Sequence, residues 1–226
     1  MTNKNFITNL QQINQLKSLA GSIAHETRNP LSAINSACEI VRKNLEEAME
    51  FLDLMSSSSS KGLVISEIIL NNIKTGEIDK SKFVNLSISE TVDEAIAKYI
   101  FEGEKEISLL NIDLKDDFNF LGDETLMSFA ILNLLKNALF YKAKIEIWLN
   151  SKTNSLHFKD YGVGIPKDKL PHIFDDFFTS NKKGGTGLGL PFCKRVMTAF
   201  GGDIFVKSEL GKWTEFELKF PNLDKI

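Results

Sequence analysis

The sequence predicts a helical hairpin that dimerises into a four-helix bundle, followed by an α+β sandwich with helices on one face of a mixed sheet. Apolar residues recur every three or four positions through the first third of the chain, which is the spacing of an amphipathic helix. After Gly76 the pattern changes to short strand-like runs mixed with helical ones. Strand-like and helical runs do not follow each other in strict alternation here. A doubly wound sheet would require such alternation. We therefore divide the chain into residues 1–78 and 79–226.

The composition is that of a soluble globular protein. Among 226 residues, 27 are Lys or Arg and 30 are Asp or Glu, giving a net charge of −3, and 42% are apolar. This balance excludes bulk disorder and a basic nucleic-acid coat, so we expect no nucleic-acid partner. The two cysteines, Cys38 and Cys193, cannot build a disulfide framework and fit a reducing compartment.

The chain has no apolar run of the roughly 20 residues that a membrane-spanning helix needs. Its first residues also lack the apolar core of a signal peptide. We expect a cytoplasmic protein, or the cytosolic part of a longer one. Membrane attachment is then expected only through a sensor module outside this chain.

The first helix is expected over residues 5–44 and its return helix over 48–75, with the turn near 43–47. A first helix about 60 Å long cannot bury its apolar seam alone, so it needs partner helices. The run Ser56–Ser60 continues the spacing and is placed inside the second helix, although a linker there is an alternative. A second copy in a symmetric homodimer would close the stripe that the hairpin leaves open. The seam comprises Phe6, Leu10, Ile13, Ala20, Ala24, Thr27, Leu31, Ile34, Cys38, Val41 and Leu45.

The second part is expected to contain both kinds of element. Strands are predicted over residues 83–86, 107–113, 145–149, 155–159, 203–207 and 214–220. Helices are predicted over residues 89–101, 123–141 and 188–200.

His25 falls one position after the seam residue Ala24, at the exposed edge of the first helix. A histidine there, beside the carboxylate of Glu26, could act as a nucleophile or a base. Asn29 lies one turn further on the same face, and Pro30 predicts a kink. An ordinary solvated histidine fits the same pattern.

The helix over 123–141 carries two amides, Asn133 and Asn137, one turn apart on an otherwise apolar face. Such amides are costly to bury unless they bind something, and Mg²⁺ fits their oxygens. The alternative is a pair of amides bonded to neighbouring backbone.

Two glycine clusters, at residues 160–166 and 184–190, each flank regular structure. Glycines before a helix let backbone N–H groups approach an anion. Neither cluster has the spacing of the dinucleotide fingerprint or the Lys of a Walker loop, and ordinary tight turns remain an alternative. The aromatic run between them, at residues 173–183, predicts a hinged lid, or else an ordinary loop.

Taken together and in this order, these motifs resemble the catalytic core of sensor histidine kinases. The resemblance covers residues 15–222. Residues 17–35 look like the H box, 129–142 the N box, 160–166 the G1 box, 173–180 the F box and 184–190 the G2 box. It implies a dimerisation and histidine-phosphotransfer hairpin, followed by the ATP-binding sandwich of the gyrase, Hsp90 and MutL group, the Bergerat or GHKL fold.

The resemblance also implies roles for individual residues. His25 would be the phosphoacceptor, Glu26 its acid–base partner, and Asn137 the residue that holds Mg²⁺. Asp160 would accept the amino group of adenine in ATP. Further nucleotide contacts are implied for Asn133, Tyr141, Lys142, Gly162, Gly164, Ile165, Lys182, Lys183, Gly185, Thr186, Gly187, Leu188 and Gly189. The implied partners are a second copy of the chain and the receiver domain of a response regulator.

Two positions depart from the family pattern. Phe140 stands where the family often has a basic residue, so one phosphate contact is lost or comes from Lys142. Asn29 stands where threonine orients water for dephosphorylating the partner, and an asparagine amide can do the same. The resemblance implies that His25 is autophosphorylated and that its phosphoryl group passes to a response regulator. It also implies that the chain dephosphorylates this response regulator. The alternatives are a degenerate kinase acting as a phosphatase or scaffold, and a nucleotide-gated machine.

Overall fold

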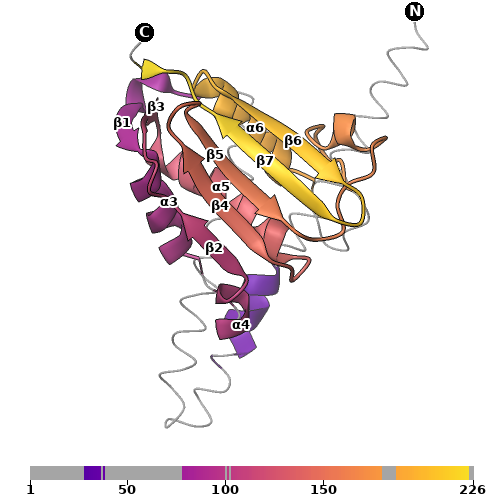
Figure 1. Ribbon diagram of the computed structural model, residues 1–226. Coiled ribbons are helices and arrows are strands. Elements are labelled where there is room, and N and C mark those ends of the chain that lie inside the picture. The colour runs from indigo at the N-terminus through magenta and orange to yellow at the C-terminus, as the bar shows by residue number, and fades with distance from the viewer. Residues whose placement is uncertain are drawn as a thin grey trace, which may run out of the picture. The chain divides into compact units, whose positions relative to one another are not determined.

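The computed structural model describes residues 28–36, 38, 78–99, 101, 103–179 and 187–223 (Figure 1). The chain divides into two compact units. One comprises residues 1–75 with 177–188, and the other residues 76–176 with 189–226. Each unit is described by itself.

In the first unit, residues 28–36 and 38 are helical. Pro30 is buried, Ala33, Ile34 and Cys38 are half-buried, and Leu31 is 63% exposed. In the single chain the buried stripe of this segment passes through Pro30, whereas Leu31, a predicted seam residue, is exposed. Burial of Leu31 in the seam of the predicted homodimer stays a prediction. Residues 30, 33 and 34 share one helix face, and Leu31 lies beside that face. The rest of the predicted hairpin, including the turn and Ser56–Ser60, lies outside the described residues.

The second unit is built on a mixed five-stranded sheet with the order β2-β4-β5-β7-β6. The pair β2 and β4 is parallel and the other pairs are antiparallel. A separate antiparallel pair joins β1 and β3. The strands are β1 (Val84–Ser87), β2 (Leu110–Asp113), β3 (Asn119–Gly122), β4 (Ile145–Asn150), β5 (Ser155–Asp160), β6 (Asp203–Glu209) and β7 (Trp213–Lys219).

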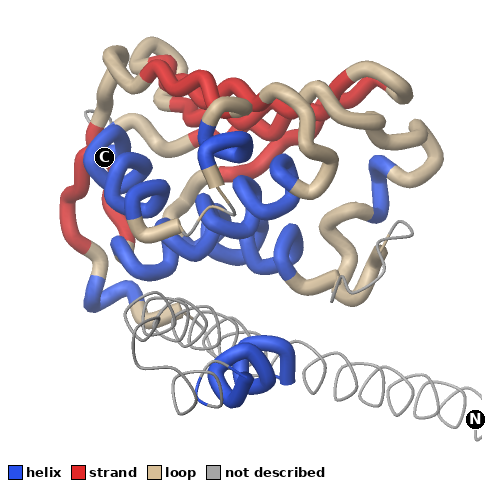
Figure 2. The backbone as a smooth tube through the Cα atoms, turned by 90° about the horizontal axis from the view of Figure 1, so that it is seen from below, coloured by secondary structure: helices blue, strands red, loops and turns tan. Residues whose placement is uncertain are grey.

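The helices of this unit gather on one side of its sheet, as Figure 2 shows. The long helices are α3 (Ile88–Ala97), α5 (Glu124–Leu139) and α6 (Gly189–Ala199). Shorter helical turns are η2 (Lys80–Lys82), α4 (Glu104–Ile107) and η3 (Leu170–His172). This arrangement confirms the predicted sandwich of helices on one face of a mixed sheet.

Alternation along the strands decides which sheet face is buried. In β4, Ile145, Ile147 and Leu149 are buried, while the residues between them are half-exposed. One face of the sheet therefore joins the apolar core with α5, whose Met127, Ile131, Leu134 and Leu135 are almost fully buried.

Side-chain caps fix where two helices begin. The Ser87 hydroxyl accepts the Glu90 N–H at 3.1 Å, and the Asp123 carboxylate accepts the Leu126 N–H at 3.0 Å. Each bond satisfies a backbone donor that the first turn of a helix leaves unpaired. The Asp123 cap explains why α5 begins where the sequence predicts.

The main differences between the sequence-based elements and the structure concern β2, α3 and β3. The predicted strand 107–113 begins only at Leu110, because Glu104–Ile107 forms a helical turn. The predicted helix 89–101 ends at Ala97. The strand β3 was not predicted, since its four residues are too few to show an alternating pattern.

The two cysteines are free thiols. Cys193 is fully buried on α6, and its Sγ lies 3.5 Å from the Ala130 carbonyl oxygen. Burial raises the pKa of Cys193 to about 12, so the thiol is neutral and inert at ordinary pH. Among the described residues, no helix is long and apolar enough to cross a membrane.

Candidate functional site

The centre of the candidate site is a buried carboxylate at the end of β5. Asp160 is only 7% exposed, and its Oδ1 accepts the backbone N–H of Gly162 at 3.0 Å. A buried acceptor of this kind is positioned by the strand and held by the following turn. It can receive a hydrogen bond from a ligand donor in a desolvated place, where such a bond is strong.

Tyr141 and Gly162 pack closely around this carboxylate. A Cβ atom added to Gly162 would lie 2.8 Å from the Asp160 Oδ1 and 2.9 Å from the Tyr141 Cβ. Burial and, to a lesser degree, the negative charge of Asp160 raise the pKa of Tyr141. The structure therefore brings Tyr141 of the N box together with Asp160 and Gly162 of the G1 box, and only glycine fits between the other two.

The loop after β5 is fastened to the hairpin between β6 and β7. Gly164 has φ +66°, and a Cβ there would lie 2.2 Å from the Glu209 carbonyl oxygen. The Ile165 N–H donates to the Ser208 Oγ at 2.8 Å, and the Gly211 N–H donates to the Val163 carbonyl at 2.7 Å. Backbone conformation and crowding thus both require glycine at 164.

Ser208 and Gly211 were not found from the sequence. Both lie more than 40 residues along the chain from the loop that they hold. A serine and a glycine in a hairpin carry no local signal of such a contact.

The two predicted amides lie on α5, and both are half-buried. The Asn133 Nδ2 donates to the Phe129 carbonyl at 2.9 Å. A Cβ added to Gly189, the first residue of α6, would lie 2.6 Å from the Asn133 Oδ1. Asn133 therefore bonds to neighbouring backbone, as one alternative held, while its amide oxygen lies against the start of α6.

Phe177 of the F box and Gly187 of the G2 box meet in the first unit. The Phe177 N–H donates to the Gly187 carbonyl at 3.0 Å, and a Cβ added to Gly187 would lie 2.5 Å from the Phe177 carbonyl carbon. Both residues have positive φ, +66° at Phe177 and +68° at Gly187. The next residue, Leu188, is buried. The predicted contacts Lys182, Lys183, Gly185 and Thr186 lie outside the described residues.

The end of α5 carries the departure from the family pattern. Phe140 is 53% exposed, and its ring lies edge-on to that of Tyr141 at 5.1 Å between centroids. Lys142 follows with φ 50°, exposed, and its N–H donates to the Leu139 carbonyl at 2.9 Å. An exposed cation and an exposed aromatic ring therefore flank Tyr141 in the sequence.

The residues of the H box are described only in part. Asn29 is exposed on the helix over residues 28–36. His25 and Glu26 lie outside the described residues.

Among the described residues, no group of three His, Cys, Asp or Glu side chains could hold a metal ion. The amide oxygens of α5 do fit a Mg²⁺ ion that brings phosphate and water oxygens as its other ligands, because Mg²⁺ prefers hard oxygen donors.

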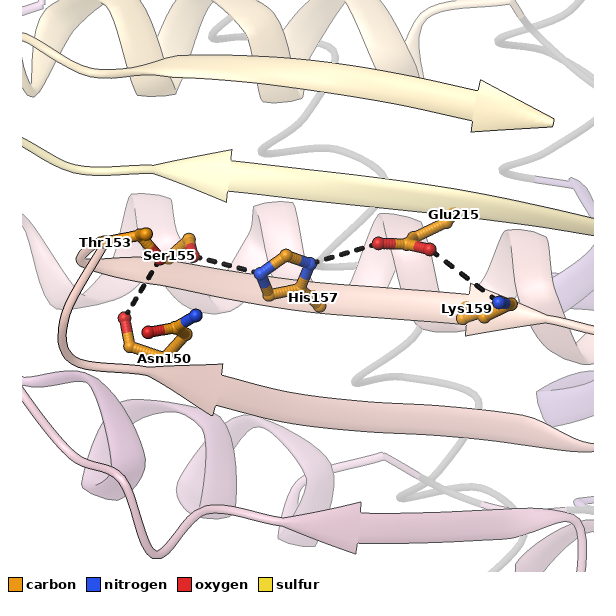
Figure 3. A network of polar contacts seen from close by, with 6 residues as sticks. All are labelled: Asn150, Thr153, Ser155, His157, Lys159 and Glu215. Carbon is orange, nitrogen blue, oxygen red and sulfur yellow. Dashed lines mark hydrogen bonds and ion pairs between the residues drawn. The ribbon is translucent and has the colours of Figure 1, made fainter.

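A second polar cluster lies on β5 and β7 (Figure 3). The His157 Nε2 is 2.9 Å from the Ser155 Oγ, and its Nδ1 is 3.2 Å from the Glu215 Oε1. The Trp148 ring stacks on the imidazole at 4.6 Å. A serine, histidine and carboxylate in this order could suggest a hydrolytic triad. Ser155 is 0% exposed, however, so it cannot attack a substrate, and we assign the cluster to the stability of the sheet.

Comparison with known proteins adds two family matches. Residues 15–71 match the His Kinase A (phospho-acceptor) domain. Residues 122–224 match the family described as histidine kinase-, DNA gyrase B-, and HSP90-like ATPase. The first match contains the H box and the second contains the N, G1, F and G2 boxes.

Curated relatives match over nearly the whole chain. The CAI-1 autoinducer sensor kinase/phosphatase CqsS of Vibrio cholerae is 32% identical over 98% of this chain and 36% of its own length. The autoinducer 1 sensor kinase/phosphatase LuxN of Vibrio campbellii is 38% identical over 93% of this chain and 26% of its own length. The chain thus spans about a third of these relatives.

Solved structures share the fold. Full-length ShkA in complex with AMPPNP matches with a TM-score of 0.59 and 22% identity, covering 91% of this chain and 45% of that one. The mycobacterial sensor histidine kinase MprB matches with a TM-score of 0.50 and 21% identity over 62% of this chain. The two family matches and the curated relatives together establish that the chain belongs to the sensor histidine kinases of two-component systems.

Proposed function

We propose that this chain transfers the γ-phosphoryl group of ATP to His25 and then to an aspartate on the receiver domain of a response regulator. The observation that carries the proposal is the meeting of Asp160, Gly162 and Tyr141 in the region that matches the ATPase family. The same chain carries His25 within the match to the phosphoacceptor domain.

In this proposal Asp160 accepts the exocyclic amine of adenine. Its carboxylate is buried and is oriented by the Gly162 N–H, so recognition would cost little reordering. Tyr141 and the loop 162–165 would line the base. The proposed contacts for the phosphates are Asn133, Lys142, Lys182, Lys183, Gly185, Thr186, Gly187, Leu188 and Gly189.

The amide oxygen of Asn137 would hold Mg²⁺, with Asn133 one turn away on the same helix. The ion, when bound, neutralises charge on the phosphates. Lysine side chains add to this effect, which an acidic protein of net charge −3 needs in order to accept a triphosphate.

In the transfer step, a nitrogen of the His25 imidazole bonds to the γ-phosphorus as the bond from phosphorus to the ADP oxygen breaks. Glu26 orients the ring or accepts the proton from its other nitrogen. A carboxylate oxygen of the response regulator then takes the phosphoryl group from the imidazole. Transfer of this kind depends mainly on alignment and charge neutralisation.

Dephosphorylation of the response regulator is part of the same proposal. The names of CqsS and LuxN describe each as a sensor kinase/phosphatase. Asn29 is exposed on its helix, where an amide can orient a water molecule toward a phosphoaspartate.

The proposed assembly is a homodimer formed by residues 1–78, with residues 79–226 as the ATP-binding domain. Its proposed location is the cytoplasm, with any membrane attachment made by a sensor module outside this chain.

The test is phosphate incorporation from labelled ATP and Mg²⁺ into the purified chain. Label that is lost in acid and stable in base identifies a phosphohistidine and supports the kinase. ATP binding detected by calorimetry without any label would contradict the proposed kinase activity. It would favour the alternative of a degenerate kinase that acts as a phosphatase or scaffold. Phe140 is the observation behind that alternative.

Replacing Phe140 by lysine is expected to tighten ATP binding about threefold, because a cation near the phosphates adds charge neutralisation at a solvent-exposed position. Calorimetry with ATP and with adenosine measures the change. Adenosine affinity should stay the same, since it has no phosphates. Equal gains for both ligands would contradict a phosphate contact and point to packing against Tyr141.

A further inference from the structure

An ion pair connects α6 to the F box. The Arg195 Nη1 lies 2.8 Å from the Asp176 Oδ1, and the two side chains are 41% and 54% exposed. Asp176 directly precedes Phe177, and Arg195 lies about two turns after Gly189, at which α6 begins.

Neighbouring contacts hold the same stretch of chain. The Lys194 Nζ lies 5.8 Å from the centre of the Phe174 ring, and Lys194 also forms an ion pair with Asp203. The Phe174 ring meets that of Phe216 edge-on at 6.5 Å. The chain just before Phe177 is therefore fixed to α6 and to the sheet of the same unit by both apolar and charged contacts.

Phe177 in turn contacts Gly187 of the G2 box. Its N–H donates to the Gly187 carbonyl, and the two backbones are too close to admit a Cβ on Gly187. Phe177 also adopts a positive φ, which a bulky residue seldom does. A conformation of this kind persists only when the surrounding structure holds it.

We propose that Asp176 and Arg195 form a positioning pair for nucleotide binding, which holds Phe177 in the conformation that bonds to Gly187. The inference rests on the proposed function, because Gly187 to Gly189 are proposed phosphate contacts. With the pair intact, the Gly187 backbone is ordered before ATP arrives. Without it, part of the binding free energy is spent on ordering this backbone, and affinity falls.

The expected effect is moderate. The pair is about half exposed, so water screens it, and we expect a two- to fivefold rise in the KM for ATP when it is broken. The kcat should change less than about twofold, because neither side chain is assigned to the reacting atoms. The difference from wild type should shrink at about 1 M salt, at which surface ion pairs are screened.

The test compares Arg195→Ala, Asp176→Ala and the charge-swapped double variant Asp176→Arg with Arg195→Asp in the full-length chain. The first measurement is hydrogen exchange of the Phe177 amide without nucleotide. We expect at least a threefold acceleration in both single variants and recovery in the double variant. The second measurement is the KM and kcat for ATP in autophosphorylation. Lys98→Ala is the matched control, since Lys98, which directly follows α3, pairs with Glu94 at 3.1 Å and both side chains are more than half exposed.

Unchanged Phe177 exchange in both single variants would overturn the inference. Faster exchange with an unchanged KM for ATP would overturn the positioning role. A double variant whose exchange and KM stay as high as those of the single variants would overturn it as well. A wild-type chain that binds no ATP would overturn the proposed function, and the positioning role with it. That outcome is recognised independently, because it concerns the unmodified chain.

Discussion

His25→Gln is expected to abolish acid-labile phosphate on the chain, by at least about 100-fold, because it removes the proposed nucleophile. Glutamine is neutral and of similar size, and its amide nitrogen is not a nucleophile at neutral pH. ATP binding should be unchanged, since the proposed nucleotide contacts all lie after residue 130. Labelling and calorimetry on the same preparation measure the two properties.

The other two histidines provide matched controls, because the chain has only three. His157 lies under the Trp148 ring with both ring nitrogens at hydrogen-bonding distance from Ser155 and Glu215. It is therefore engaged on both nitrogens and should not accept phosphate. His157→Gln should keep its label, although it is expected to lower thermal stability by disturbing the polar cluster.

His172 is the more demanding control. Its side chain is 59% exposed, and its Nδ1 lies 2.8 Å from the Asp175 Oδ2. An exposed imidazole next to a carboxylate resembles, in chemistry, the proposed pair of His25 and Glu26. Label that survives His25→Gln and disappears in His172→Gln would assign the phosphoacceptor to His172, just before the F box, and contradict our assignment.

The sequence predicted the sandwich well where the signal is local. Helix α5 shows a long apolar period and begins at an aspartate cap, and β4 alternates between buried and half-exposed residues. Such patterns can be recognised within a single stretch of consecutive residues. The short strand β3 has no such pattern, and it forms because β1 pairs with it across more than 30 residues of chain.

The candidate site divides in the same way. The glycines and Asp160 stand out because their types and spacing are unusual, and the structure places Gly162 against both Asp160 and Tyr141. The contacts that hold the site in shape do not stand out. Ser208 bonding to Ile165 and Arg195 pairing with Asp176 join common polar residues from distant segments. Only the fold brings these pairs together.

Asp160→Asn is expected to weaken ATP binding about 10- to 100-fold, the loss that follows from removing a hydrogen bond to a buried charged acceptor. The asparagine oxygen can still accept the Gly162 N–H, so the loop should keep its shape. The asparagine NH₂ group is a donor, and it would replace a carboxylate oxygen beside the donor amine of adenine. Calorimetry with ATP measures the loss.

A second nucleotide separates recognition of the base from support of the loop. Inosine triphosphate has the same sugar and phosphates but lacks the amine. The wild type should therefore bind ATP more tightly than inosine triphosphate, and Asp160→Asn should remove most of this preference. Asp116→Asn is the control, because Asp116 is an exposed carboxylate that bonds the Ser151 N–H and hydroxyl.

An equal loss for both nucleotides would mean that Asp160 acts through the Gly162 loop rather than on adenine. Unchanged ATP affinity would mean that the buried carboxylate faces no ligand donor. The preference between the two nucleotides is thus the more informative quantity. Damage to the fold lowers both affinities, whereas loss of the amine contact lowers only one.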